Sequence, residues 1–133
     1  MDPDLTVEDV KAASLELQTE VASFVPEDWV ERIEQRETGV LLRCHEEDTY
    51  QWTGRTFVFL VEPQKDDQLL RDIADAFEGA EFSRDAGTPD AVVRTAEGGV
   101  VVVSYRDDRA TVSIGAGSAC FKLREGQNHW DEY

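Results

Sequence analysis

The last third of the chain consists of short runs of β-branched residues that alternate with turn signals. The runs span residues 91–96, 100–106 and 109–114. Because Glu97-Gly98-Gly99 and Asp107-Asp108 supply turns between them, the runs are typical of an antiparallel meander. Residues 100–103 are all valine, which favours a central strand covered on both faces. A helix must therefore pack on this sheet.

Two segments have the three- and four-residue apolar spacing of amphipathic helices. The first spans residues 6–24, and its Thr6 and Asp9 resemble a capping box. The second begins at residues 66–67, where either aspartate can cap it, and Gly79 occupies the left-handed position that commonly follows a helix. The apolar face of this second helix is expected to contain Leu69, Leu70, Ile73, Ala74 and Phe77.

Further strands are predicted where apolar runs lie between polar loops. They are expected at residues 30–37, at 40–44, from 49 onward and at 80–84. The first of these fits helix or strand about equally, and we favour strand. In the strand from residue 49 the aromatic side chains change parity after Thr53, which a β-bulge at Gly54 would explain. Loops are expected through Gly87 and Pro89, in a bend at 115–119 and in the tail at 124–133.

These elements predict an α+β fold. It consists of a mainly antiparallel twisted sheet of about five to seven strands, with the N-terminal helix and one middle helix packed on it. A length of 133 residues suits one domain. We predict a single α+β domain over residues 1–133, made of the helix at 6–24, the sheet and helix at 30–123 and the tail at 124–133.

Acidic residues outnumber basic residues by 29 to 13, and the formal net charge is -16. This charge repels phosphate backbones and anionic membrane surfaces, so nucleic acid is not an expected partner. The acidic residues either form a solvated surface or create an electrostatic field that attracts a basic protein partner. No apolar run is long enough to span a membrane, and the chain does not begin with a signal peptide. This start fits a cytosolic protein, and it equally fits a chain whose signal segment lies upstream.

Few residues could carry chemistry. His45 lies beside three carboxylates and His129 lies near two, but both groups have the composition of exposed loops and lack regular ligand spacing. Gly115-Ala116-Gly117 lacks the third glycine and the helix of a phosphate-binding loop. No serine lies in a GxSxG motif. We therefore predict no catalytic residue, no metal site and no cofactor, and a protein that is not an enzyme.

Aromatic side chains serve either core packing or an interface. We expect Trp52 and Phe121 in the core. Aromatic residues in the polar tail would dock on the domain or on a partner. The possible interface residues are Trp29, Tyr50, Trp130 and Tyr133.

The chain has two cysteines. Cys44 ends an apolar strand, and Cys120 follows the small residues of the predicted bend. They are either buried thiols or a bridge across the sheet. No CxxC redox motif is present, and two further ligands for a zinc site are missing.

Three segments resemble motifs of small actinobacterial cell-envelope lipoproteins of undefined function. They are Leu41-Leu42-Arg43-Cys44, Tyr50-Gln51-Trp52-Thr53-Gly54 and Ser118-Ala119-Cys120-Phe121, and the likeness covers residues 26–133. The resemblance implies that Cys44 and Cys120 form a disulfide. It also implies export and attachment to the outer face of the membrane through a lipidated N-terminal cysteine, which is not present here. Either that anchor lies upstream, or the chain is a cytosolic relative.

Three functions follow as expectations. The first is a non-enzymatic, extracytoplasmic, lipoprotein-like binding domain of the cell envelope, monomeric and engaging a protein partner. The alternative is an acidic immunity or inhibitor protein that neutralises a basic toxin or enzyme, and a cytoplasmic location is the alternative to the envelope. A small-molecule carrier comes third, because a sheet covered by two helices can enclose a pocket.

Overall fold

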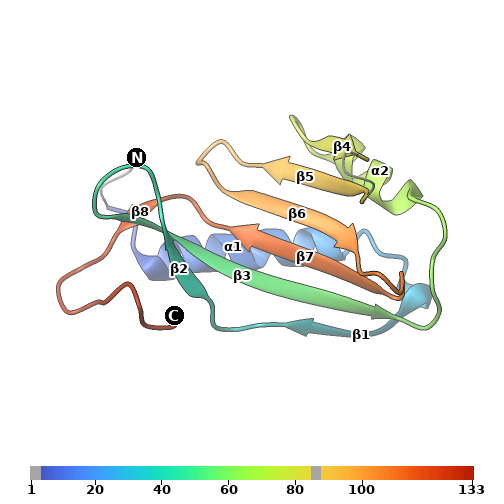
Figure 1. Ribbon diagram of the computed structural model, residues 1–133, viewed down its shortest axis with the longest axis horizontal. Helices are drawn as coiled ribbons and strands as arrows, with labels where there is room; N and C mark the ends of the chain where they lie inside the picture. Colours follow the sequence, from blue (N-terminus) through green and yellow to red (C-terminus); the bar gives the residue numbers. More distant parts are fainter. Residues whose placement is uncertain (1–3, 85–87) are drawn as a thin grey trace.

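The structure is a computed structural model that describes residues 4–84 and 88–133. The described residues form two α-helices, one 3-10 helix and a sheet of eight strands (Figure 1). In chain order these are α1 (Val7–Ala22), η1 (Glu27–Trp29), β1 (Val30–Gln35), β2 (Val40–Arg43), β3 (Thr49–Leu60), α2 (Gln68–Ala76), β4 (Glu81–Ser83), β5 (Asp90–Arg94), β6 (Val100–Tyr105), β7 (Thr111–Gly117) and β8 (Phe121–Lys122).

The sheet is antiparallel throughout and is organised around the long strand β3. Its strand order is β1-β3-β7-β6-β5-β4, and both β2 and β8 also pair with β3. Because β3 has 12 residues, its C-terminal half pairs with β1 and its N-terminal half with β2. The predicted α+β fold is confirmed, and β8 makes the strand number eight. A strand of two residues is too short to leave a pattern in the sequence.

Helix α1 begins where the sequence predicts. The Thr6 side-chain oxygen accepts a hydrogen bond from the Asp9 amide at 3.2 Å, and an Asp9 carboxylate oxygen accepts one from the Thr6 amide at 3.2 Å. This reciprocal capping box satisfies two amides that the helix itself leaves unpaired. The helix ends at Ala22, four residues before Pro26, which cannot continue a helix.

Both helices cover the same face of the sheet. Helix α1 runs behind β3, β7 and β6 (Figure 1), and α2 packs against β4 and β5. The main core joins α1 and α2 to the central strands, and its fully buried members include Val21, Leu70, Ile73, Val103 and Ile114. A smaller core at the opposite end of β3 contains Val10, Tyr50, Trp52 and Phe121. Trp52 and Phe121 are fully buried, as predicted.

The predicted β-bulge at Gly54 is wrong. Strand β3 pairs with β7 without a shift through Gly54, and the core-facing side keeps one parity from Trp52 to Val58. Phe57 and Phe59 lie on the other face, where arginine side chains stack over their rings. Arginine can cover an aromatic ring as a neighbouring strand would, so the sequence pattern suggested a change of face that does not occur.

The valine run of β6 is covered on one face only, which corrects the expectation of two covered faces. Val101 and Val103 point into the core and are 1% and 0% exposed, whereas Val102 is 38% exposed. Strand β6 is nevertheless central, because it pairs with β5 and β7. A continuous apolar run therefore does not here indicate burial on both sides.

The predicted bend at 115–119 is shorter than expected. Gly115 and Gly117 belong to β7 and pair with both β3 and β6, so the chain leaves the sheet only at Ser118. Glycine weakens a strand but keeps its backbone donor and acceptor, and neighbours on both sides hold it here. Gly87 of the loop predicted before β5 lies outside the described residues.

Asp67 stabilises the start of α2 by ion pairing. The cap on the Gln68 amide comes from an Asp66 carboxylate oxygen at 3.1 Å, whereas the buried Asp67 carboxylate accepts hydrogen bonds from Arg84 and from Arg109, the latter at 2.8 Å. Arg109 also donates to the Gln64 carbonyl oxygen at 2.5 Å. Burial alone would raise the pKa of the Asp67 carboxyl, but the hydrogen bonds and charges of Arg109 and Arg84 together lower it.

Replacing this carboxylate should destabilise the protein in a pH-dependent way. We expect Asp67→Asn to lower the free energy of unfolding by about 1–3 kcal/mol at neutral pH, because it removes a charged acceptor from two arginines. Since the folded-state pKa is lowered, the ionised group stabilises the fold above its unfolded pKa and loses this effect as pH falls through the folded value. Urea unfolding should show the two proteins converging below about pH 4. A pH-independent difference would contradict this role.

Candidate functional site

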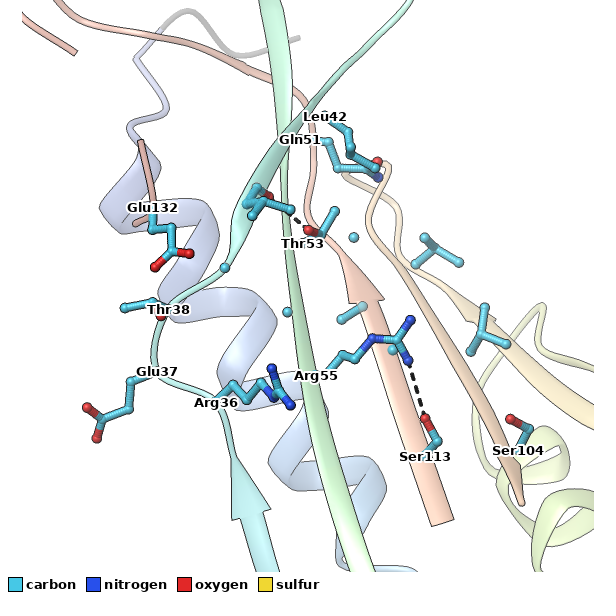
Figure 2. Close-up of a pocket in the computed structure, with 18 residues that line it drawn as sticks. Arg36, Glu37, Thr38, Leu42, Gln51, Thr53, Arg55, Ser104, Ser113 and Glu132 are labelled. Atoms are coloured by element: carbon cyan, nitrogen blue, oxygen red, sulfur yellow. Dashed lines mark hydrogen bonds between the residues drawn. The ribbon is translucent and has the colours of Figure 1, made fainter. Parts of the chain in front are cut away.

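The face of the sheet opposite the helices is not covered by a helix (Figure 1), and it is hollowed (Figure 2). The hollow has a volume of about 920 Å³ and lies over β2, β3, β7 and β6. We call this surface the open face. The residues that line it are Arg36, Glu37, Thr38, Gly39, Val40, Leu42, Gln51, Thr53, Gly54, Arg55, Val100, Val102, Ser104, Ser113, Gly115, Ala116, Gly117 and Glu132.

The hollow exists because its floor is built from small residues. In β7 the core-facing Val112 and Ile114 alternate with Ser113, Gly115 and Gly117 on the open face. A methyl group placed on Gly117 would meet the end of the Gln51 side chain, which would have to move aside. Small side chains on the central strand therefore lower the floor between the flanking strands.

One wall of the hollow is apolar. Val40 and Leu42 of β2 are each 52% exposed, and Val102 of β6 is 38% exposed on the opposite side. Among the described residues, the other large apolar side chains with comparable exposure are Ile33, Val61 and Trp130. Half of the exposed large apolar side chains thus gather on one surface, which is the arrangement that marks interaction sites.

Besides hydroxyl and amide side chains, the open face carries two glutamates, Glu37 and Glu132, and two arginines, Arg36 and Arg55. Arg55 projects from β3 across the floor, with Nη1 3.5 Å from the Ser113 hydroxyl, and Arg36 lies close to it beyond β1 (Figure 2). Neither guanidinium makes an ion pair within the described residues. Arg36 and Arg106 stack over the Phe57 ring at 5.5 and 4.8 Å from its centre. In a strongly acidic protein, this face offers free cationic donors beside apolar side chains.

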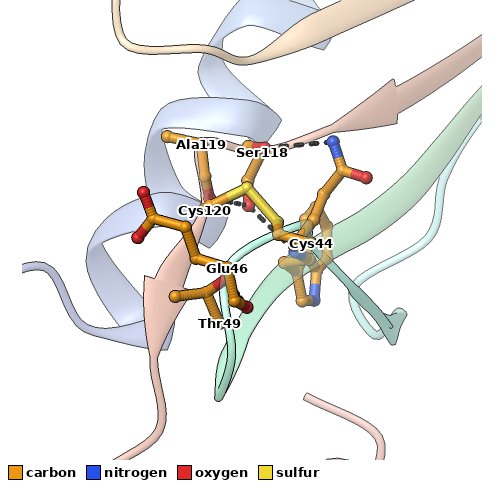
Figure 3. The surroundings of a disulfide bond; sticks show 8 residues. Cys44, Glu46, Thr49, Ser118, Ala119 and Cys120 are labelled. Carbon is orange, nitrogen blue, oxygen red and sulfur yellow. Dashed lines mark hydrogen bonds between the residues drawn. A yellow bond between two sulfur atoms is a disulfide. The ribbon is translucent and has the colours of Figure 1, made fainter. Parts of the chain in front are cut away.

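A disulfide between Cys44 and Cys120 holds the wall in place (Figure 3). Their Cα atoms are 6.4 Å apart, so the bridge ties the end of β2 to the segment between β7 and β8. Beside it the Ser118 hydroxyl accepts a hydrogen bond from the Trp52 amide at 2.9 Å and donates one to the Ala119 carbonyl at 2.8 Å. The β2–β3 hairpin is therefore fastened to β7, whose residues form the floor.

The possible interface residues do not form one surface. Tyr50 is buried and stacks on His129 at 5.4 Å between ring centres, and Trp130, 71% exposed, contacts the same His129. Tyr133 docks on the domain, where its backbone pairs with Gly39 in two hydrogen bonds of 3.0 and 3.1 Å. Trp29 packs against the main core at the other end of the molecule. The interface role stays a prediction for all four residues, of which Trp130 is the most exposed.

Neither His45 nor His129 lines the open face, although Glu132 of the second histidine-containing loop does. Within residues 4–84 and 88–133, no group of three or more His, Cys, Asp or Glu side chains is placed to hold a metal ion. Neither α1 nor α2 has the length and apolar character of a membrane-crossing helix.

The open face itself was not predicted from the sequence. The sequence feature that indicates it is the set of small residues at every second position of β7. Neighbouring strands have apolar side chains on the same face of the sheet. No protein-family model, curated protein or solved structure matches the chain. Its function must therefore be inferred from the open face, the disulfide and the charge.

Proposed function

We propose that this protein is a non-enzymatic, extracytoplasmic binding domain that engages a protein partner through the open face. The observation that carries the proposal is the hollow of about 920 Å³ on an uncovered sheet, with exposed Val40, Leu42 and Val102 around it. Exposed apolar side chains that surround a concavity favour association, since covering them removes apolar area from water. The small floor residues leave room for side chains of the partner.

The charges of the open face favour a particular kind of contact. Arg55 and Arg36 are free to pair with a carboxylate, and such charge-assisted hydrogen bonds give orientation as well as affinity. The matching partner segment carries aliphatic side chains next to an aspartate or glutamate. Binding such a segment would require no catalytic residue in this domain.

The disulfide supports a location outside the cytoplasm. Disulfides persist in oxidising compartments and are rare in the reducing cytosol. The resemblance to envelope lipoproteins points the same way. The net charge of -16 favours a second candidate, an acidic inhibitor of a basic toxin or enzyme, since its field would speed association with a cationic protein.

Photo-crosslinking can test the open face in the native cells. A benzophenone amino acid placed at Val102, on the open face, should form a discrete adduct with one envelope protein. The matched position is Val61, which is 60% exposed but lies outside the open face. Because both sites tolerate a large exposed side chain, the fold should survive at either position.

The two positions should give different results. An adduct from position 102 that is lost in an Arg55→Glu background would support binding through this face. Equal adducts from both positions, or none from position 102, would contradict it. A basic toxin or enzyme in the adduct, with a yield that falls steeply at high salt, would favour the inhibitor.

A further inference from the structure

We propose a second binding site, for a small apolar amine, between α1 and the β5–β6 turn. A pocket of about 320 Å³ lies there, on the helix-covered side of the sheet, and of its lining residues only Val100 and Gly117 also line the open face. Val10, Ala13 and Leu17 line it from α1, Leu5 from the segment before the helix, Val101 from β6 and Ala119 from the segment between β7 and β8. Its volume is at the lower end of the range for small-molecule sites, which suits a ligand of roughly ten heavy atoms.

The three hydroxyl groups that line this amine pocket are already hydrogen-bonded within the protein. The Ser14 hydroxyl accepts a hydrogen bond from the Gln18 side chain at 3.3 Å. The Ser118 hydroxyl is bonded to the Trp52 amide at 2.9 Å. The Thr95 hydroxyl accepts from the Gly99 amide at 2.9 Å. A ligand must therefore present an apolar body to the interior, because a buried polar group without a partner costs free energy.

Two carboxylates at the pocket set the charge of the ligand. Asp9 and Glu97 both line it, both are exposed, and no lysine, arginine or histidine is among the lining residues. Within residues 4–84 and 88–133 neither carboxylate makes an ion pair. Lys11, on the same helix, is instead directed over the Trp52 ring. The net charge of -16 further favours a cation and disfavours an anion.

Three probes of similar shape separate these properties. Phenethylamine has an aromatic body and an ammonium group, phenylethanol is its neutral counterpart, and phenylpropionate is anionic. In a titration of the ¹⁵N-labelled full chain, phenethylamine should shift the amide signals of Ala13, Gly99 and Ala119. Phenylethanol should bind several-fold more weakly, and phenylpropionate should cause no saturable shift at these amides.

Variants locate the site. Ala13→Phe should fill the pocket and abolish the saturable shifts, whereas Ala12→Phe, also exposed on α1 but outside the pocket, should leave them unchanged. Glu97→Gln, a change at the exposed rim, should weaken phenethylamine roughly threefold to tenfold and leave phenylethanol unaffected. The proposal is overturned if phenethylamine gives no saturable shifts, if phenylpropionate binds equally well, or if Ala12→Phe abolishes binding as Ala13→Phe does.

Discussion

Removing the Cys44–Cys120 bridge is expected to lower the free energy of unfolding by about 4–5 kcal/mol. The bridge spans a sequence separation of 76, and closing a loop of that length restricts the unfolded chain far more than the folded one. Domains of this size are commonly stable by only about 5–15 kcal/mol, so the loss is a large fraction of the total. The double variant Cys44→Ala/Cys120→Ala is the appropriate test, because it leaves no reactive thiol.

Urea unfolding of the oxidised wild type, the reduced wild type and the double variant measures this effect. The reduced protein and the double variant should have similar, lowered stabilities, since both lack the same cross-link. A loss below about 1 kcal/mol would mean that the rest of the fold holds the β2–β3 hairpin against β7 without the bridge.

Truncating Trp52 should have an effect of similar size, about 3–5 kcal/mol for Trp52→Ala. The indole is fully buried in the smaller core, and its Nε1 donates a hydrogen bond to the Tyr133 carbonyl oxygen at 2.7 Å. The change therefore creates a cavity and also removes one of the hydrogen bonds that hold Tyr133 on the domain. Besides a lowered urea midpoint, we expect faster amide exchange at Gly39 and Tyr133, whose backbones pair with each other.

Trp130→Ala is the matched control for this prediction. Trp130 is 71% exposed and contacts His129, so its removal should change stability by less than about 0.5 kcal/mol. If Trp52→Ala were as mild as this control, the smaller core would not stabilise the hairpin and tail as described.

Local chemistry made much of the fold predictable. The capping box at Thr6 and Asp9, the start of α2 near residues 66–67 and the meander at the end of the chain all follow from patterns that span a few residues. The disulfide was expected only through the family resemblance, because spacing alone left buried thiols equally open. The disulfide depends on tertiary structure, because it forms where β2 and β8 both pair with β3.

The open face could not be predicted because it depends on where both helices pack. The four valines of β6 suggested two covered faces, and only the placement of α1 and α2 on one side leaves Val102 exposed. Similarly, Phe57 and Phe59 of β3 point away from the core, where arginine side chains and not a second layer cover their rings. The sequence pattern does not show which of the two covers an aromatic residue. Long-range packing therefore determines which face of the sheet is covered, and local residue patterns do not show this.

The oxidation state of the two cysteines in native cells is the most direct test of an extracytoplasmic, disulfide-tied binding domain. Thiols should be trapped with an alkylating reagent before lysis, and the intact protein should then be weighed. We predict no alkylation and a mass two hydrogens below that of the reduced chain, with both cysteines becoming reactive after reduction. Alkylation of both Cys44 and Cys120 without reductant would contradict the proposed compartment.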